Sequence, residues 1–94
     1  MTFEWDEVKS AWTKVERDID FPYASTVFLD NEGIEGESRP KNGETRYYAV
    51  GKAVFGELLY VVYTWRDYEN QKNCRIISAR KASKKERSRY PRLR

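Results

Sequence analysis

The sequence predicts an α+β fold, in which two N-terminal helices pack on an antiparallel sheet of about four strands and a basic helix follows. Apolar residues recur with helical spacing over residues 6–29, and apolar runs joined by turn residues follow between residues 46 and 79. Consecutive strands joined by short turns pair antiparallel. A chain of 94 residues is long enough for one domain, so residues 1–94 are expected to fold as a single unit.

The first helix is expected to begin after Asp6, whose carboxylate can accept hydrogen bonds from backbone N–H groups of the first turn. One face of its helical period carries the apolar side chains Val8, Ala11, Trp12, Val15 and Ile19. Because the helix is expected to pack on the sheet, this apolar face is the one that should meet it. Residues 2–5, which immediately precede this cap, are typical of a short first strand.

A second helix is expected to follow at once. Asp20 can cap it, and Pro22 falls in its first turn, where a missing N–H group costs nothing. Its inward face is expected to hold Phe21, Ala24, Val27 and Phe28. The helix should end at residues 29–31.

The middle of the chain predicts a loop and three strands. Residues 30–45 are rich in acids, glycine and proline, which is typical of a loop with room for a short edge strand near residues 33–37. Strands are expected at residues 46–52, 58–65 and 74–79, with turns at residues 53–56 and 67–73. Because residues 58–65 are almost wholly apolar, this strand should lie centrally with both faces covered.

The C-terminal segment, residues 81–94, is strongly basic. Residues 1–79 carry 10 Lys and Arg against 14 Asp and Glu, a net charge of −4, whereas residues 80–94 carry 8 against 1, a net charge of +7. Ser83 and Glu86 form a capping box for a basic helix over residues 83–90, which Pro91 ends. This asymmetry favours a polyanion or an acidic protein as partner, although a tail that only aids solubility explains it equally well.

The composition excludes several kinds of site. The chain has no His and one Cys, Cys74, which excludes Ser-His-Asp and Cys-His nucleophile systems and zinc sites. The acids between residues 30 and 37 are not spaced as an EF-hand loop and the glycines form no phosphate-binding motif, so neither a metal nor a cofactor is expected. No apolar run reaches membrane-spanning length, and the single cysteine favours an intracellular, cytoplasmic protein.

Arginines stand near the ends of the expected strands, at Arg46, Arg66, Arg75 and Arg80, and aromatic residues lie among them, at Tyr47, Tyr48, Tyr63 and Trp65. Guanidinium groups suit phosphate oxygens and aromatic rings stack on unpaired bases, so the pattern favours single-stranded RNA. The alternative is that these tyrosines are half-buried strand residues and the arginines are solvated. In a regular strand Arg75 and Ser78 face opposite ways, so they share a face only if the strand ends or bulges near Ser78.

Several motifs carry a resemblance to a known family. The most specific is Arg75-Ile76-Ile77-Ser78-Ala79-Arg80-Lys81-Ala82 followed by Glu86-Arg87-x-x-Tyr90. Weaker ones are Phe3-x-Trp5-Asp6-x-x-Lys9, Phe21-x-x-Ala24-x-x-Val27-Phe28-x-Asp30, Gly43-Glu44-x-Arg46 and Val61-Val62-Tyr63-Thr64-x-Arg66. On these motifs nearly the whole chain resembles the BrnT toxins of bacterial type II toxin–antitoxin systems.

The resemblance implies a RelE-like ribonuclease fold and a metal-independent ribonuclease that inhibits translation until a cognate antitoxin masks it. It also implies a BrnA-like antitoxin with a ribbon-helix-helix part, through which the complex binds DNA and represses its own operon. In one respect the chain departs from the family pattern. Glu16-Arg17-Asp18 stands where the family usually has Lys-His-Gly between its first two helices. Asp18 can replace that glycine as a helix C-cap.

Metal-free RNA cleavage needs a base near the 2′-OH and cations on the phosphate that develops charge. The candidate catalytic residues are Arg46, Arg66, Arg75, Arg80 and Glu86. Without His, the candidate bases are Glu44, Glu86, Lys81 and Tyr90. The candidate RNA-binding residues are Lys81, Tyr63, Trp65, Tyr90 and Ser78. The missing His leaves two alternatives: a catalytically degenerate module that only binds an antitoxin or RNA, and a purely structural partner protein.

Overall fold

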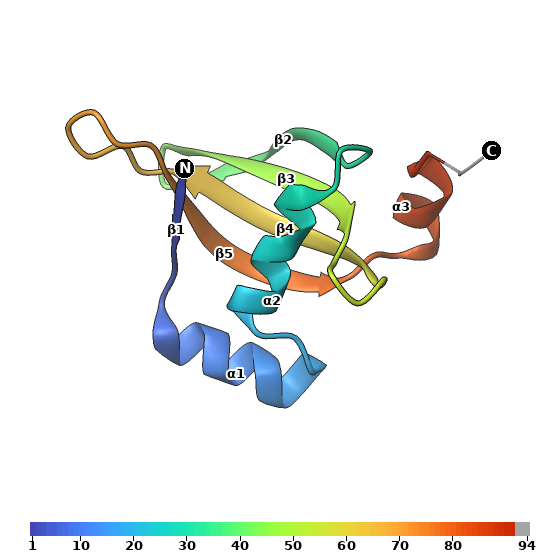
Figure 1. Cartoon of the computed structure of the whole chain (residues 1–94). Helices are drawn as coiled ribbons and strands as arrows, with labels where there is room; N and C mark the ends of the chain where they lie inside the picture. Colours follow the sequence, from blue (N-terminus) through green and yellow to red (C-terminus); the bar gives the residue numbers. More distant parts are fainter. Residues whose placement is uncertain (92–94) are drawn as a thin grey trace.

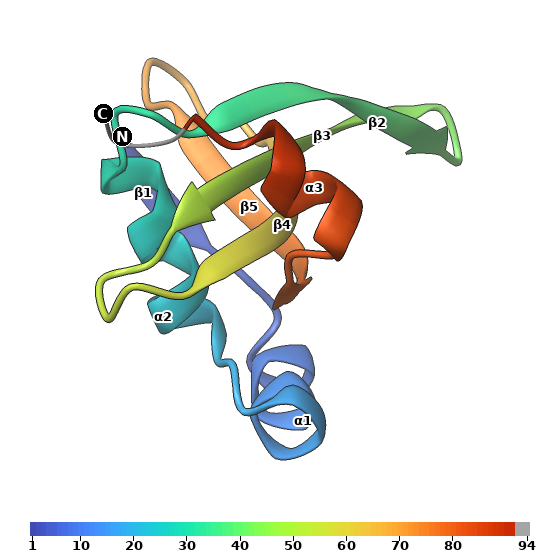
Figure 2. The same ribbon diagram turned by 90° about the vertical axis from the view of Figure 1, so that its right-hand side faces the viewer.

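The computed structural model describes residues 1–91, which form one sheet with helices on both of its faces and at one edge (Figure 1 and Figure 2). The elements in order are β1 (Thr2–Glu4), α1 (Glu7–Arg17), α2 (Phe21–Ser25), the 3-10 turn η1 (Thr26–Leu29), β2 (Ile34–Lys41), β3 (Glu44–Lys52), β4 (Leu58–Trp65), β5 (Asn73–Lys81) and α3 (Lys84–Arg89). The predicted α+β class is confirmed, and so is the central position of β4.

The sheet differs from the prediction in strand number and direction. It has five strands in the order β1-β5-β4-β3-β2, and β1 runs parallel to β5 while the other pairs are antiparallel. The fifth strand is β2, which lies at the sheet edge and is longer than the short edge strand near residues 33–37 for which the predicted loop left room. β2 pairs on one side only and carries Gly36 and Pro40, residues that strands usually avoid, so its backbone pairing left little trace in the sequence.

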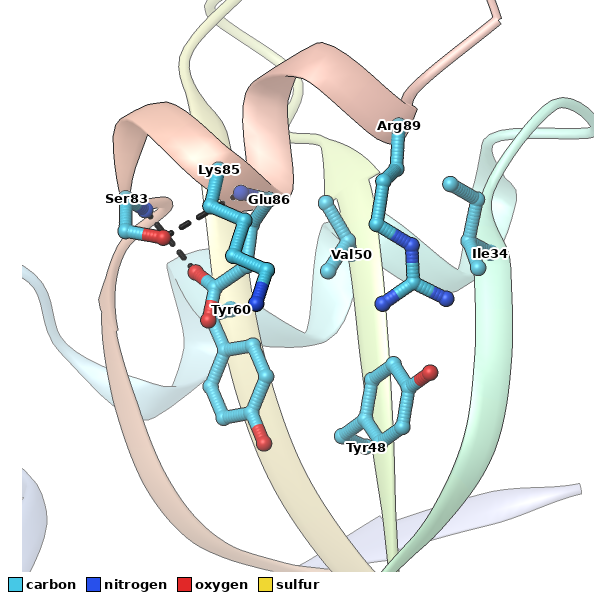
Figure 3. A pocket seen from close by; sticks show the side chains of 8 residues that line it. All are labelled: Ile34, Tyr48, Val50, Tyr60, Ser83, Lys85, Glu86 and Arg89. Atoms are coloured by element: carbon cyan, nitrogen blue, oxygen red, sulfur yellow. Dashed lines mark hydrogen bonds between the residues drawn. The ribbon is translucent and has the colours of Figure 1, made fainter.

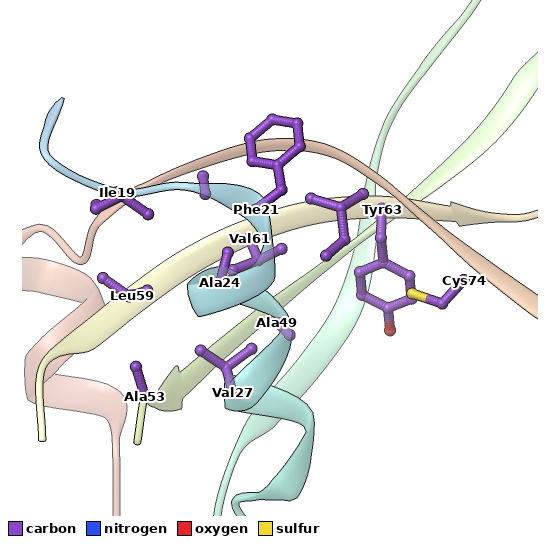
Figure 4. Close-up of a cluster of buried hydrophobic side chains, with 12 residues drawn as sticks. Ile19, Phe21, Ala24, Val27, Ala49, Ala53, Leu59, Val61, Tyr63 and Cys74 are labelled. Atoms are coloured by element: carbon purple, nitrogen blue, oxygen red, sulfur yellow. The ribbon is translucent and has the colours of Figure 1, made fainter. Parts of the chain in front are cut away.

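The core lies between the sheet and the α2–η1 segment (Figure 4). Phe21 and Ala24 are fully buried and Val27 is buried beside them, which confirms the predicted inward face of the second helix. Phe28 completes it, with its ring edge-on to Tyr63 at a centroid distance of 5.0 Å. The caps are also as predicted, because the side chain of Asp20 accepts a hydrogen bond from the backbone N–H of Tyr23.

The helix α1 and its cap at Asp6 are as predicted, and Ile19 is buried, but the rest of the predicted apolar face turns to solvent. Val8, Trp12 and Val15 are 79%, 52% and 80% exposed, whereas Ser10 and Thr13 are buried. Two hydrogen bonds account for the small polar residues inside: the hydroxyl of Ser10 accepts from the backbone N–H of Phe21, and that of Thr13 donates to the Lys9 carbonyl. We call the exposed face, formed by Val8, Trp12 and Val15, the α1 apolar face.

The docking of α1 depends on an open sheet edge. β1 pairs only with Asn73–Arg75, so the rest of the outer edge of β5 has no strand beside it. Arg17 donates a hydrogen bond from Nη1 to the Ala79 carbonyl at this edge. Asp18 then ends the helix with a left-handed φ of 58°, so it does take the place of a C-cap glycine.

A β-bulge interrupts the pairing of β4 with β5. Val62 pairs with Ser78, but the next residue, Tyr63, pairs with Ile76. Ile77 is therefore an extra residue, and beyond it the side-chain alternation of β5 changes phase. This is the bulge that would let Arg75 and Ser78 share a face.

The basic segment begins in β5 and continues into a short helix, α3. The capping box of Ser83 and Glu86 is present as predicted. The Tyr90 hydroxyl donates a hydrogen bond to Asp30, which ties the end of α3 to the turn before β2. The last three residues of the predicted basic segment 81–94 lie outside the described residues.

We expect Val61→Ala to lower the free energy of unfolding by about 2–3 kcal/mol, because Val61 is fully buried beneath α2. The matched change Val15→Ala should alter it by no more than about 0.5 kcal/mol, because Val15 is exposed. Urea denaturation of both variants measures the difference. Equal losses would show that α1 packs through its apolar face after all.

Candidate functional site

The face of the sheet opposite α2 carries the predicted arginines. In the register of β4 and β5, Thr64 pairs with Arg75, Val62 with Ser78 and Tyr60 with Arg80. Because of the bulge at Ile77, Arg75, Ser78 and Arg80 all lie on this face, while Cys74, Ile76 and Ala79 are buried in the core. We call it the arginine face.

Three of the arginines gather at one end of this face, in a surface cavity of ≈ 180 Å³. Arg46 comes from β3, Arg75 from β5, and Arg66 directly follows β4. The cavity is lined by Asp6, Lys9, Glu44, Arg46, Arg66, Arg75, Ile76 and Ile77. Arginines from two strands and from the segment after a third thus form one cationic site, which we call the arginine cluster (Arg46, Arg66 and Arg75).

Two glutamates hold the cluster in place. Glu44 accepts a hydrogen bond from Nη2 of Arg66 at 2.9 Å, and its other oxygen lies 3.7 Å from Nε of Arg46. Glu4 of β1 accepts from Nη1 of Arg75 at 2.8 Å. Within residues 1–91 the buried Nε of Arg46 has no hydrogen-bond partner, which is uncommon for a buried donor.

Lys9 of α1 was not among the predicted site residues, yet it lines the same cavity. Partial burial lowers the pKa of Lys9 below its ordinary value, and the charges of Arg46 and Lys41 lower it further. A lowered pKa raises the neutral fraction of a lysine, and only the neutral amine can accept a proton. The sequence contains one indication of Lys9 as a site residue, its place in the weak motif that begins at Phe3. Residue spacing along the chain does not reveal that α1 lies beside β5.

Arg80 and Glu86 form a separate unit on the same face. The two side chains make a bidentate ion pair with both N–O distances at 2.8 Å, and the Arg80 guanidinium lies 4.1 Å from the centroid of the Tyr60 ring. The hydrogen bond from Arg80 is the largest cause that lowers the pKa of Glu86 to about 2. So acidic a carboxyl is a poor proton acceptor, and Glu86 is better suited to positioning Arg80 and capping α3.

Three of the predicted residues lie away from the arginine face. Tyr63 is 3% exposed and its ring packs among Phe28, Tyr47 and Trp65, so it offers no surface to a base. Trp65 lies half-buried on the same core side. Lys81 points the other way from Arg80 and lies 3.5 Å from Glu57.

Tyr90 is tied to Asp30, and burial together with that hydrogen bond raises the pKa of Tyr90 to about 12. Such a hydroxyl is protonated at neutral pH and is not a general base. Of the candidate bases named from the sequence, Glu44 alone lies in the arginine cluster.

In the described part of the chain, no group of three His, Cys, Asp or Glu side chains is arranged to hold a metal ion. Among residues 1–91, no helix is long and apolar enough to cross a membrane. The arrangement that remains is a set of positioned cations beside a lysine with a lowered pKa. It can bind a phosphodiester and stabilise negative charge that develops on it.

Comparison with known proteins gives two findings. Residues 5–86 match the family model described as "Ribonuclease toxin, BrnT, of type II toxin-antitoxin system". The crystal structure of the Brucella abortus ribonuclease toxin BrnT superposes with a TM-score of 0.61 at 20% sequence identity, over 89% of this chain and 99% of that one. At that identity the match shows a shared fold. A comparison with curated protein sequences gives no match.

We expect the Arg80–Glu86 pair to contribute stability that depends on pH. The pKa of Glu86 is lowered from 4.5 to about 2 in the folded protein, so the contribution is complete above pH 4.5 and is lost as the pH falls toward 2. Because the pair is partly solvated, its size should be of order 1 kcal/mol.

Thermal unfolding of Glu86→Gln and of the wild type, measured across this pH range, tests the effect. The two curves should differ near neutral pH and converge in acid. Glu37→Gln, at an exposed position of β2, is the matched control and should follow the wild type throughout. A constant difference between Glu86→Gln and the wild type at every pH would contradict the assignment.

Proposed function

The chain belongs to the BrnT family of ribonuclease toxins of type II toxin–antitoxin systems, and from this premise we propose that it is a metal-independent endoribonuclease that inhibits translation in the cytoplasm. The observation that supports the proposal is the convergence of Arg46, Arg66 and Arg75 with Lys9 in one cavity. Cations at fixed positions are what a metal-free phosphodiester cleavage requires.

In the proposed reaction the 2′-oxygen of the RNA attacks the adjacent phosphorus. The O2′–P bond forms, the P–O5′ bond breaks, and the products carry a 2′,3′-cyclic phosphate and a 5′-hydroxyl. The 2′-OH gives its proton to a base, and the departing 5′-oxygen takes one from solvent. The arginine cluster stabilises the extra negative charge on the phosphorane, because hydrogen bonds from charged donors to an anionic oxygen are stronger than those from neutral donors.

Lys9 is the base that the geometry favours. Glu44 already accepts a hydrogen bond from Arg66 and lies near Arg46, so it serves to position these side chains. Lys9 lies beside them with a lowered pKa, and its amine, once deprotonated, has a lone pair for the 2′-OH proton.

The absence of His favours a second candidate function, a catalytically degenerate module that only binds RNA or an antitoxin. In this chain Arg17 occupies the family's histidine position and hydrogen-bonds to the edge of β5, which gives that position a structural role. Purified protein that binds RNA but releases no cleavage product would favour this alternative over the nuclease.

We expect Arg75→Gln to lower the rate of RNA cleavage by about 10²-fold or more, because one positioned cation on the developing charge is lost. The assay is run on labelled single-stranded RNA in EDTA, where the wild type should cleave as fast as in magnesium. Arg39→Gln, at an exposed position of β2, is the control and should keep wild-type activity. Loss of wild-type activity in EDTA with recovery in magnesium would contradict the metal-independent reaction.

We expect the cleavage rate of the wild type to rise with pH and to level off above the pKa of Lys9, because only the neutral amine accepts a proton. This plateau should begin at a lower pH than the ordinary lysine pKa allows, since the pKa of Lys9 is lowered. Lys9→Arg keeps the charge but cannot lose a proton, so it should lose both activity and the pH-dependent rise. A fully active Lys9→Arg protein would remove Lys9 from this role.

We also propose that a cognate BrnA-like antitoxin neutralises the toxin and supplies the ribbon-helix-helix part that binds DNA. The α1 apolar face offers a surface for such a partner, because Val8, Trp12 and Val15 stand at helical spacing and are all more than half exposed. It lies on the helix that carries Lys9, so a segment bound there would sit next to the arginine cluster.

We expect Trp12→Glu to abolish neutralisation when toxin and antitoxin are expressed together, because a charge would be placed in the centre of an apolar contact. Phe55→Glu, which changes an 85% exposed aromatic residue in the β3–β4 turn, is the matched control and should still be neutralised. Growth of the co-expressing cells and co-purification of the two proteins measure the effect. Full neutralisation of Trp12→Glu would place the antitoxin elsewhere.

A further inference from the structure

A second cavity lies on the arginine face, between α3 and the sheet, with a volume of ≈ 260 Å³ (Figure 3). Its floor is made by Tyr48 of β3 and Tyr60 of β4, and its upper rim by Lys85 and Arg89 of α3. It is separate from the arginine cluster, because the two cavities share no lining residue. We call it the tyrosine pocket.

The two tyrosine rings are arranged as an aromatic platform. They are nearly parallel, with an interplanar angle of 10° and a centroid distance of 5.5 Å, and both are half-buried. Gly36 of β2 makes room for one of them, because a Cβ at that position would lie only 2.8 Å from the Tyr48 ring. A glycine inside a strand often marks such a close approach.

Cations surround the platform. Lys85 and Arg89 are one helical turn apart on α3, and Figure 3 shows both side chains extending toward the rings. Neither forms a salt bridge within residues 1–91. Arg80 lies over the Tyr60 ring, held there by Glu86. Aromatic rings beside free cations are the combination that binds an unpaired base together with its phosphate.

The sheet register connects the tyrosine pocket to the arginine cluster. Along β4 the outward residues run from Tyr60 through Val62 to Thr64, which pairs with Arg75. The four-residue step from Tyr60 to Thr64 covers about 13 Å along the strand. Ser78 stands between, opposite Val62. A strand of RNA with one phosphate at the arginine cluster would have to cross about 13 Å of this face to reach the tyrosine pocket.

We propose that the tyrosine pocket binds one base of the single-stranded RNA substrate, stacked on Tyr48, whose ring packs against Tyr60, with an adjacent phosphate on Lys85 and Arg89. The proposal deepens the proposed ribonuclease function and rests on it for the identity of the ligand. The pocket supplies affinity and the placement of the strand, whereas the arginine cluster acts on the phosphate that is cleaved. Stacking accepts every base, so the base preference is expected to be modest.

The test uses a short fluorescent single-stranded RNA whose 2′-OH groups are all methylated, so that it binds but cannot be cleaved. Tyr48→Leu and Tyr60→Leu should each weaken binding about tenfold, measured by fluorescence anisotropy. The slope of affinity against salt should not change, because no phosphate contact is lost. The double variant Lys85→Gln/Arg89→Gln should weaken binding and also reduce this slope. Tyr68→Leu, in the β4–β5 loop, is the control and should bind as the wild type does.

A second arm separates stacking from a structural effect. RNA molecules that lack one base are tested position by position, and one such position should weaken binding to the wild type but not to Tyr48→Leu. Thermal unfolding checks that each variant is folded. The Lys85 and Arg89 changes, which lie on the exposed surface of α3, test the pocket without altering the sheet.

The outcomes distinguish the pocket from the ribonuclease function. Wild-type protein that binds the methylated RNA with these tyrosine effects but cleaves no natural RNA would retain the pocket and overturn the nuclease. Active protein whose tyrosine variants are folded and bind RNA with unchanged affinity would overturn the pocket. Tyrosine variants that lose antitoxin binding while keeping RNA binding would also overturn it, in favour of a protein-docking site.

Discussion

The candidate site depends on one extra residue in β5. Ile77 interrupts the pairing with β4, so the residues on its two sides do not follow a single alternation. Cys74, Ile76 and Ala79 can then all be buried in the core while Arg75 and Arg80 both face outward. In a regular strand one of the two arginines would point into the core, where an unpaired guanidinium is very costly. The bulge thus allows one strand to contribute side chains both to the core and to the arginine face.

The acidic residues of this face organise the arginines. Glu4, Glu44 and Glu86 lie on different elements, and each makes an ion pair with at least one arginine. Partly exposed pairs of this kind add little to the free energy of folding. Their effect is to fix where the guanidinium groups point before any phosphate arrives, which lowers the ordering that binding would otherwise require. Two of the acidic residues in the negatively charged part of the chain, Glu4 and Glu44, are therefore part of the cationic site.

The structure shows two different surfaces, the arginine face and the α1 apolar face, which composition alone does not distinguish. The arginine face is cationic and aromatic, which suits RNA, whereas the α1 apolar face is uncharged at its centre, which suits a protein. They meet at α1, since this helix carries Lys9 on one side and Trp12 on another. A partner bound to the apolar face would therefore lie close to Lys9 and the arginine cluster. This arrangement would allow an inhibitor to act by covering the site.

The sequence by itself determined most of the local structure of this protein. The caps at Asp6, Asp20 and Ser83, the buried face of α2 and the central strand β4 follow from side-chain chemistry and spacing, which act over a few residues. The motif around Arg75 and Arg80 also indicated the family. These features need no knowledge of the rest of the fold.

Only the tertiary structure decided which faces meet. The apolar stripe of α1 indicated a buried helix, but the open edge of β5 accepts Arg17 and the polar side of α1 instead. Tyr63 and Tyr48 are equally aromatic in the sequence, yet strand register puts one in the core and the other in the tyrosine pocket. Lys9 joins arginines more than thirty residues away because α1 packs along β5. Register, bulges and edges arise from pairing between distant segments, and short-range patterns do not contain them.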